Sequence, residues 1–267
     1  DRGGGCINLD TTDDQPGTGL GGSRQDPLKN RKRGVICGNK LLCRQPGADA
    51  LTQIAATDAT GVVLAANGPV FSAGHDFRDI GGKSLDEVAH LVQTCADLMQ
   101  LIQRLPQVVV AKVHALATAA GAQLVASCDL AVAADTAGFA APGGKGGWFC
   151  HTPMVAIARD IGRKRAMELA LTGDVIDAAT AHDWGLVNRV VSPVDLAAAT
   201  HELLTAATRG SRHSKATGKA ALYDQLSMSQ ADAYRYATQV MAEASQTVDA
   251  QEGVAAFLEK RHARWLP

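Results

Sequence analysis

The sequence has few aromatic residues, almost no net charge and no long apolar run. Aromatic residues make up 4% of its 267 residues, which argues against a surface on which nucleic-acid bases stack. A net charge of −1 creates no overall field that would attract nucleic acid or an anionic membrane. Apolar stretches stay shorter than the roughly 18 residues of a membrane-spanning helix, and the start lacks the pattern of a signal peptide. We therefore expect no nucleic-acid and no membrane partner.

The six cysteines include no Cys-x-x-Cys pair. Three of them lie in apolar segments, where a reduced cysteine packs as a small hydrophobic side chain. This usage favours a reducing compartment, and it predicts neither a structural zinc nor any other metal site.

Residues 1–47 differ in character from the rest of the chain. They are rich in glycine, they contain the basic cluster "KNRKR" at 29–33, and we find no helical or strand period in them. We interpret them as an atypical, poorly ordered or divergent segment that is hard to reconcile with paired strands. A basic contact for a phosphate is the alternative.

From residue 48 the pattern is that of an α/β protein. Three apolar runs are typical of buried strands: "GVVLAA" (61–66), "VVVAKV" (108–113) and "LAVAA" (130–134). Ser84 and Glu87 form a capping-box signature before an amphipathic helix that Pro106 ends. A short helix of small residues is predicted at 119–128, and the alternation of strands and helices indicates largely parallel pairing. Beyond Pro153 we expect helices near 154–171, 177–183, 194–208, 214–226, 229–246 and 250–262.

The stretch "GPVFSAGHDF" (68–77) follows the first strand almost at once. Gly74 allows a sharp bend, so the next backbone N–H, that of His75, could point into a cleft. The segment "HALATAAGAQL" (114–124) leads into a helix start, whose first amides are unpaired and lie at the positive end of the dipole. Two such donors on one oxygen would form an oxyanion hole. Close packing of small residues is the alternative.

Four ordered motifs resemble the enoyl-CoA hydratase/isomerase (crotonase) family. They are "GPVFSAGHDF", "ATAAGAQLVASCDLAVAAD", "RKRAMELALTGDVIDAATAHDWGLVNRVV" and "QEGVAAFLEKR", and the resemblance covers about 60–262. It implies an α/β fold built as a crotonase-like ββα spiral, which we place at 48–193. A C-terminal helical trimerisation region would follow at 194–267. The family also implies a homotrimer or hexamer that binds an acyl-CoA or enoyl-CoA thioester.

The resemblance assigns roles to individual residues. It places the two oxyanion N–H groups on His75 and Ala120, so the side chain of His75 need not be catalytic. Contacts with the coenzyme A portion fall on Ala73, Asp76 and Lys260. Lys260 would meet the phosphates bound by a neighbouring subunit, and a favourable charge at a helix C-terminus is the alternative. Further candidates for its phosphates, each more simply interpreted as a solvated charge, are Lys29, Arg31 and Lys32. Coenzyme A would enter as part of the substrate, and no separate cofactor is expected.

The chain departs from the family where hydratases carry two glutamates. Gln123 stands at the first position and Gly143 at the second, and neither side chain transfers a proton near neutral pH. His151 matches the place of a nucleophilic aspartate in one branch of the family and has a suitable intrinsic pKa, although a surface or capping role is the alternative. Cys150 beside it is interpreted as a core residue.

The resemblance is strongest to a mitochondrial "enoyl-CoA hydratase domain-containing" branch that also lacks both glutamates. It implies an enoyl-CoA hydratase/isomerase-like lyase that stabilises a thioester enolate. The alternatives are an acyl-CoA-binding protein without turnover, or isomerisation or thioester hydrolysis through His151. The expected location is the cytoplasm, or the mitochondrial matrix if the chain is eukaryotic.

Overall fold

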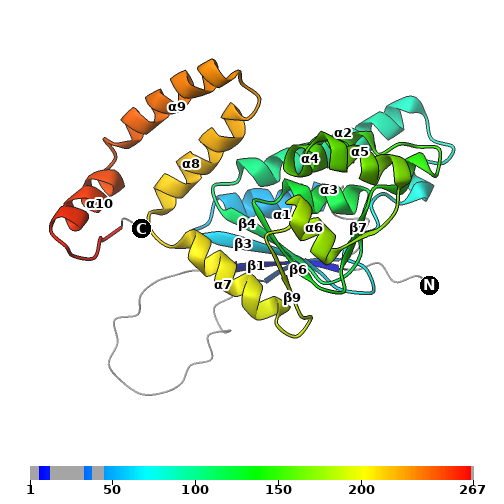
Figure 1. Ribbon diagram of the computed structural model, residues 1–267, viewed down its shortest axis with the longest axis horizontal. Coiled ribbons are helices and arrows are strands. Elements are labelled where there is room, and N and C mark those ends of the chain that lie inside the picture. The colour runs from blue at the N-terminus through cyan, green and yellow to red at the C-terminus, as the bar shows by residue number, and fades with distance from the viewer. Residues whose placement is uncertain (1–5, 13–32, 38–44, 266–267) are drawn as a thin grey trace.

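The computed structural model describes residues 6–12, 33–37 and 45–265, which form two sheets flanked by helices (Figure 1). In spatial order, the strands of the larger sheet are β2 (Arg33–Cys37), β1 (Cys6–Thr12), β3 (Gly61–Ala66), β4 (Val108–Val113), β6 (Leu130–Ala134) and β9 (Arg189–Val191). The smaller sheet contains β5 (Ala117–Thr118), β7 (Gly138–Ala140) and β8 (Ile176–Asp177). Strands β3, β4 and β6 pair in parallel, which confirms the three predicted strands and their pairing. Strand β9, which the sequence did not indicate, pairs in parallel with β6.

The central strands are apolar throughout because both faces of the sheet are covered. In β3, Val62 and Leu64 belong to the larger core cluster, whereas Val63 belongs to a second cluster on the opposite face. Leu204 of helix α7 (Leu196–Thr208) completes this second cluster. Complete burial of each such side chain contributes about 1.5–3 kcal/mol, so the sequence uses uninterrupted apolar runs here in place of alternation.

The expectation for residues 1–47 is wrong for two described segments. Strand β1 pairs antiparallel with both β2 and β3, so these segments extend the main sheet. The alternation of Ile7 and Leu9 with Asn8 and Asp10 is a strand pattern, short enough to be hidden among the surrounding polar residues and glycines. The candidates Lys29, Arg31 and Lys32 lie outside the described residues.

The helices α1 (Gln45–Ala55), α2 (Leu85–Arg104) and α3 (Ala120–Ser127) lie on the face of the sheet that carries the larger core cluster, to which later helices also contribute. The predicted capping box is present at the start of α2. The amide of Glu87 donates to Ser84 Oγ at 3.3 Å, and the amide of Ser84 donates to Glu87 Oε2 at 2.9 Å. The bond from the Ser84 amide to the Glu87 carboxylate, together with the hydrogen bond from Lys83, lowers the pKa of Glu87 to about 2.

The single helix predicted at 154–171 is wrong, because Gly162 divides it. Helix α4 (His151–Ile161) ends at this glycine and α5 (Arg163–Thr172) begins after it. Gly162 has a φ of 76°, a left-handed conformation that glycine adopts without the strain of a side chain. The break leaves α4 and α5 free to pack at an angle to each other.

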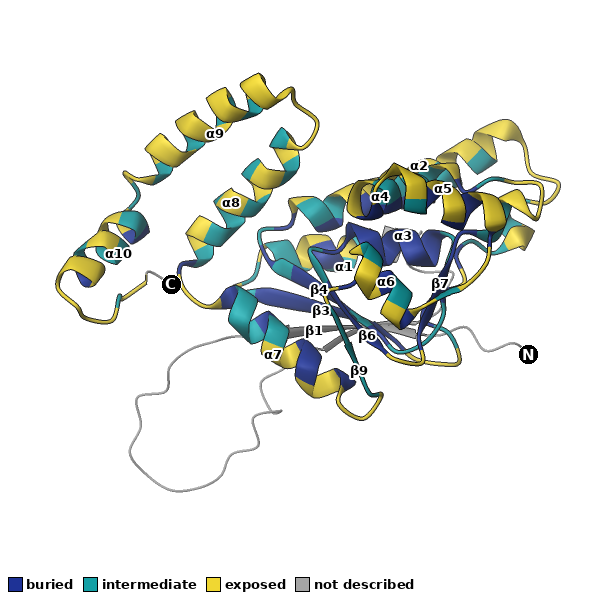
Figure 2. Ribbon diagram, in the orientation of Figure 1, coloured by how far each residue is buried: buried dark blue, intermediate teal, exposed yellow. Residues whose placement is uncertain are grey.

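The remaining helices are α6 (Ala178–Trp184), α7, α8 (Arg212–Gln225), α9 (Gln230–Ala244) and α10 (Val248–Leu258). Helix α7 packs on β3, β4 and β6 and so shares the core of the sheet, although we expected it in the C-terminal region. Figure 2 shows that α8, α9 and α10 extend away from the sheet and are largely exposed. Within the described ranges, no helix is both long and apolar enough to cross a membrane.

Candidate active site

The turn after β3 lies beside the start of α3. Ser72 forms an isolated parallel bridge with Ala117, and the amide of Thr118 donates to the carbonyl of Ser72 at 2.9 Å. Gly74 follows with a φ of 82°. A Cβ on Gly74 would stand 3.1 Å from the backbone nitrogen of Ala120. The residue that precedes His75 therefore lies against the first residue of α3.

The start of α3 is held in an unusual backbone conformation. Ala119 has a φ of 53° and a ψ of −119°, and no side chain caps the helix. A non-glycine residue in such a region costs on the order of 1–3 kcal/mol and persists only when its surroundings fix it. Here the amide of Ala119 donates to Ala140 at 2.9 Å, and its carbonyl accepts from Gln123 at 3.1 Å. Both peptide groups that flank the strained residue are thus fixed.

Close approach of α3 to the turn depends on Gly121. A Cβ on Gly121 would lie 2.7 Å from Ser72 Cβ and still closer to the carbonyl oxygen of Ser72. Any larger residue would push the helix away from the turn.

The amides of His75 and Ala120 have no hydrogen-bond acceptor among the described residues. Ala120 is only 4% exposed, and an unpaired buried N–H typically costs about 1–3 kcal/mol. The amide of Ala120 also lies in the first turn of α3, where the helix dipole favours negative charge. Two free donors on contacting segments are chemically suited to binding a carbonyl oxygen or an anion.

The residues at and beside His75 differ in burial and in the contacts that their side chains make. Burial lowers the pKa of His75, partly opposed by the charge of Asp79, and its ring centroid lies 6.4 Å from that of Trp148. Asp76 caps the short helix η1 (Phe77–Asp79) and pairs with Arg78 at 2.7 Å. Ala73 is exposed. The roles of Ala73 and Asp76 toward coenzyme A stay predictions.

Gln123 lies one turn into α3 and is 4% exposed. Its Oε1 atom is buried without a hydrogen-bond partner within the described part of the chain, as is Oγ1 of Thr118. The structure thus places a neutral amide, unable to transfer protons near neutral pH, just behind the free amide of Ala120.

Gly143 stands at the start of a tight loop after β7. A Cβ there would lie 2.8 Å from Cys150 Sγ and even closer to the carbonyl oxygen of Trp148. Cys150 is 7% exposed, in keeping with its interpretation as a core residue, and burial raises the pKa of its thiol. The space into which a side chain at position 143 would extend is therefore already filled by protein.

His151 begins α4 and is exposed. Its amide donates to the carbonyl of Phe149 at 2.8 Å, and its ring centroid lies 5.1 Å from that of Phe149. Lys260 follows α10, which Figure 1 shows far from α3, on the other side of α8. Within one chain, Lys260 is thus not brought to the free amides.

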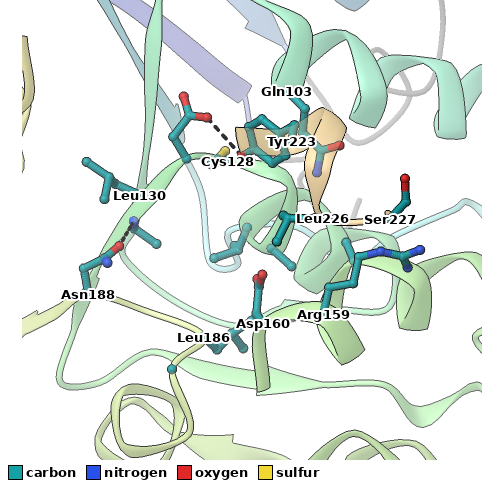
Figure 3. Close-up of a pocket in the computed structure, with 16 residues that line it drawn as sticks. Gln103, Cys128, Leu130, Arg159, Asp160, Leu186, Asn188, Tyr223, Leu226 and Ser227 are labelled. Atoms are coloured by element: carbon teal, nitrogen blue, oxygen red, sulfur yellow. Dashed lines mark hydrogen bonds between the residues drawn. The ribbon is translucent and has the colours of Figure 1, made fainter. Parts of the chain in front are cut away.

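A cavity of about 380 Å³ lies at the other end of α3, where Val125, Ala126 and Cys128 line it (Figure 3). Asp129 on its wall is neutralised by Lys219 at 2.7 Å and bonded by the hydroxyl of Tyr223 at 3.0 Å. Since Lys219 and Tyr223 belong to α8, their bonds to Asp129 hold this helix against the body of the protein. The cavity lies at the C-terminal end of α3 and does not reach the free amides of His75 and Ala120, so it is not part of the candidate site. We place that site at the N-terminal end of α3, where the two free amides are.

Two residues of this site escaped the sequence analysis. Trp148 contacts His75 across a long sequence separation, and only the rarity of tryptophan, with three in the chain, singles it out. Gly121 is required by close packing on Ser72, and its place inside a helical pattern was the available signal.

Comparison with known proteins agrees with this geometry. Residues 43–266 match the family model described as enoyl-CoA hydratase/isomerase. The mouse "enoyl-CoA hydratase domain-containing protein 3, mitochondrial" is 42% identical over 249 residues, which cover 91% of this chain and 82% of that protein. An enoyl-CoA hydratase structure from Mycobacterium smegmatis has a TM-score of 0.79 at 43% identity, covering 82% of this chain and 86% of that one. The human domain-containing protein 3 structure has a TM-score of 0.76 at 39% identity, covering 82% and 90%.

Proposed function

The chain belongs to the enoyl-CoA hydratase/isomerase family, and we propose that it binds an acyl-CoA or enoyl-CoA thioester through the backbone amides of His75 and Ala120. The solved relatives confirm the predicted crotonase-like α/β fold with a helical C-terminal region. The observation that carries the proposal is the pair of free N–H groups on contacting segments. No separate cofactor takes part, since coenzyme A arrives with the acyl group.

The two amides would act on the thioester carbonyl as it gains negative charge. A carbonyl oxygen becomes an enolate oxygen when a proton leaves the adjacent carbon, and hydrogen-bond donors fixed in advance stabilise that charge. Each such donor is typically worth about 10²–10³ in rate. Hydrogen bonds hold both peptide groups of Ala119 in place, and this supports such preorganisation of the Ala120 amide.

Hydration by two glutamates does not fit this chain. The amide of Gln123 cannot take a proton from water near neutral pH, and a side chain at position 143 would collide with Trp148 and Cys150. The reaction we propose is therefore restricted to enolate stabilisation by a hydratase/isomerase-like lyase, with the acid–base group still to be identified. Isomerisation or thioester hydrolysis through the exposed His151 remains a hypothesis within it.

A second candidate function is acyl-CoA binding without turnover. The crowding at Gly143 favours binding without turnover. The position does not merely lack a glutamate, because the surrounding protein leaves no space for any acid–base side chain there. The two candidates share the binding step and differ only in whether a proton is moved.

We also propose that the chain forms a homotrimer or hexamer through its C-terminal helices. Met241 of α9 and Phe257 of α10 are 79% and 82% exposed, and exposed apolar residues on extended helices are typical of an interface. The vertebrate relatives are named as mitochondrial, which favours the mitochondrial matrix over the cytoplasm if this chain is eukaryotic.

Calorimetric binding of acetyl-CoA, together with the absorbance loss of crotonyl-CoA, tests the proposal. Ala120→Pro removes one donor N–H at a first helical position, where proline fits the helix. We expect acetyl-CoA affinity to fall about tenfold and any turnover to fall about 10²–10³. Ala178→Pro, at the first position of α6, is the matched control and should bind as the wild type does.

The outcomes separate the two candidates. Binding with turnover favours the enzyme, and binding without turnover favours the second candidate. An Ala120→Pro variant that binds acetyl-CoA like the wild type would refute the role of this amide. A wild-type protein without affinity for acetyl-CoA would refute both functions.

A further inference from the structure

Hydrogen bonds and an ion pair hold the loop that carries Trp148 in place. The amide of Trp148 donates to the carbonyl of Gly143 at 3.0 Å, and the amide of Lys145 donates to Pro142 at 3.0 Å. Lys145 is also paired with Asp174 at 2.5 Å. Because backbone hydrogen bonds hold the main chain on both sides of the glycine-rich stretch, the backbone that carries the indole is fixed in position.

The indole of Trp148 stands next to the turn that supplies the first free amide. Its ring centroid is 6.4 Å from the imidazole of His75, with the two rings tilted by 51°. Since the amide of His75 is one of the two proposed donors, the indole lies beside the side chain of a residue that would hold the bound oxygen. Burial lowers the pKa of His75, so its ring favours the neutral form that suits an apolar wall.

The rings of His75 and Trp148 give this part of the site an apolar wall. The exposed Arg78 that follows the turn is already paired with Asp76 at 2.7 Å, so its charge is largely compensated. Trp148 belongs to the loop that contains the crowded Gly143 and leads to the buried Cys150. A thioester carbonyl joins a large charged portion to an apolar acyl chain, and a wall of two rings suits the acyl chain better than the charged portion.

We propose that Trp148 and His75 together close the acyl end of this site and restrict it to short acyl groups. The inference rests on the proposed acyl-CoA site and adds its substrate class. A long straight acyl chain would have to displace the indole, which the bonded loop holds in place. A short acyl group would end against the two rings.

The test compares the affinities of free coenzyme A, acetyl-CoA and octanoyl-CoA for the 267-residue chain by calorimetry. Trp148→Ala should raise the affinity for octanoyl-CoA relative to acetyl-CoA about tenfold, as expected for room to bury roughly two further methylene groups. Trp148→Phe should change the ratio in the same direction but less, and it tests the proposal if the alanine variant fails to fold. Trp265→Ala is the matched control, since Trp265 is 41% exposed and Trp148 is 40% exposed.

The results distinguish this inference from the proposed function. If neither Trp148 variant changes the ratio of octanoyl-CoA to acetyl-CoA affinity, the inference is overturned while acyl-CoA binding stands. An equal gain for free coenzyme A would also overturn it, because the indole would then lie beside the coenzyme portion. Absence of binding to all three compounds by the wild type would overturn the proposed function and this inference together.

Discussion

Replacing Gly143 by alanine should destabilise the protein because no space exists for a methyl group. The added Cβ would lie 2.8 Å from Cys150 Sγ and 3.0 Å from the backbone nitrogen of Cys150, and closer still to the carbonyl oxygen of Trp148. Two of these three atoms belong to the backbone, so a side-chain rotation cannot relieve the crowding. Overpacking of this kind costs about 1–3 kcal/mol. Taking about 2 kcal/mol, we expect Tm to fall by roughly 4–8 °C.

Gly146→Ala is the matched control for this prediction. It lies in the same loop, and its added Cβ would meet nothing closer than Gly143 O at 3.7 Å, an ordinary contact. Urea denaturation should show the loss of unfolding free energy for Gly143→Ala and little change for Gly146→Ala. If the two variants are equally stable, the loop does not fill the space beside position 143 and the steric argument is wrong.

The same crowding bears on activity. Gly143→Glu, alone or with Gln123→Glu, would restore the residue types of a hydratase at both positions. The carboxylate at 143 could be accommodated only if Trp148 and Cys150 moved, so we expect no hydration of crotonyl-CoA from either variant. Rapid hydration by the double variant would contradict this expectation.

Three further predictions follow from buried contacts. Lys219→Met leaves Asp129 without its cation and should lower the free energy of unfolding by about 3–5 kcal/mol, whereas Tyr223→Phe should cost about 1 kcal/mol; comparable losses in urea titrations would contradict this. Asp160 is exposed at the cavity, but partial desolvation by the surrounding protein raises the pKa of its carboxyl from 3.8 to about 7, and Figure 3 shows this carboxylate directed into the cavity. The proton on the Asp160 carboxyl stabilises the folded state fully below about pH 4, and this contribution is lost as pH rises through 7. Asp160→Asn should therefore raise Tm at about pH 8 but not at about pH 4. Gly121→Ala should push α3 from Ser72 and weaken acetyl-CoA binding at least tenfold, while Gly218→Ala, with open space around it, should not.

The core of the fold was predictable because its signals are local. The strands at 61–66, 108–113 and 130–134 match the structure, since uninterrupted apolar runs between helices have few other interpretations. The capping box of Ser84 and Glu87 was equally local. The break at Gly162 was missed because apolar residues continue on both sides of it, and only the left-handed φ reveals the end of α4.

The candidate site was predictable only in part. Gly74 and the small residues before α3 marked the two segments that meet, because such residues are needed for a bend and a close approach. The contact of Trp148 with His75 joins residues far apart in the sequence, and no local pattern indicates it. The filled space beside Gly143 is likewise a property of packing: the sequence showed that glutamate was absent but not that there was no room for it.

Infrared spectroscopy of bound acetyl-CoA, isotope-labelled at the thioester carbonyl carbon, tests the central claim most directly. If the amides of His75 and Ala120 both bind the oxygen, the carbonyl band should move to lower frequency than in water, and Ala120→Pro should reverse part of that shift while Ala178→Pro should not. A band at its position in water, or one that Ala120→Pro leaves unchanged, would contradict the claim.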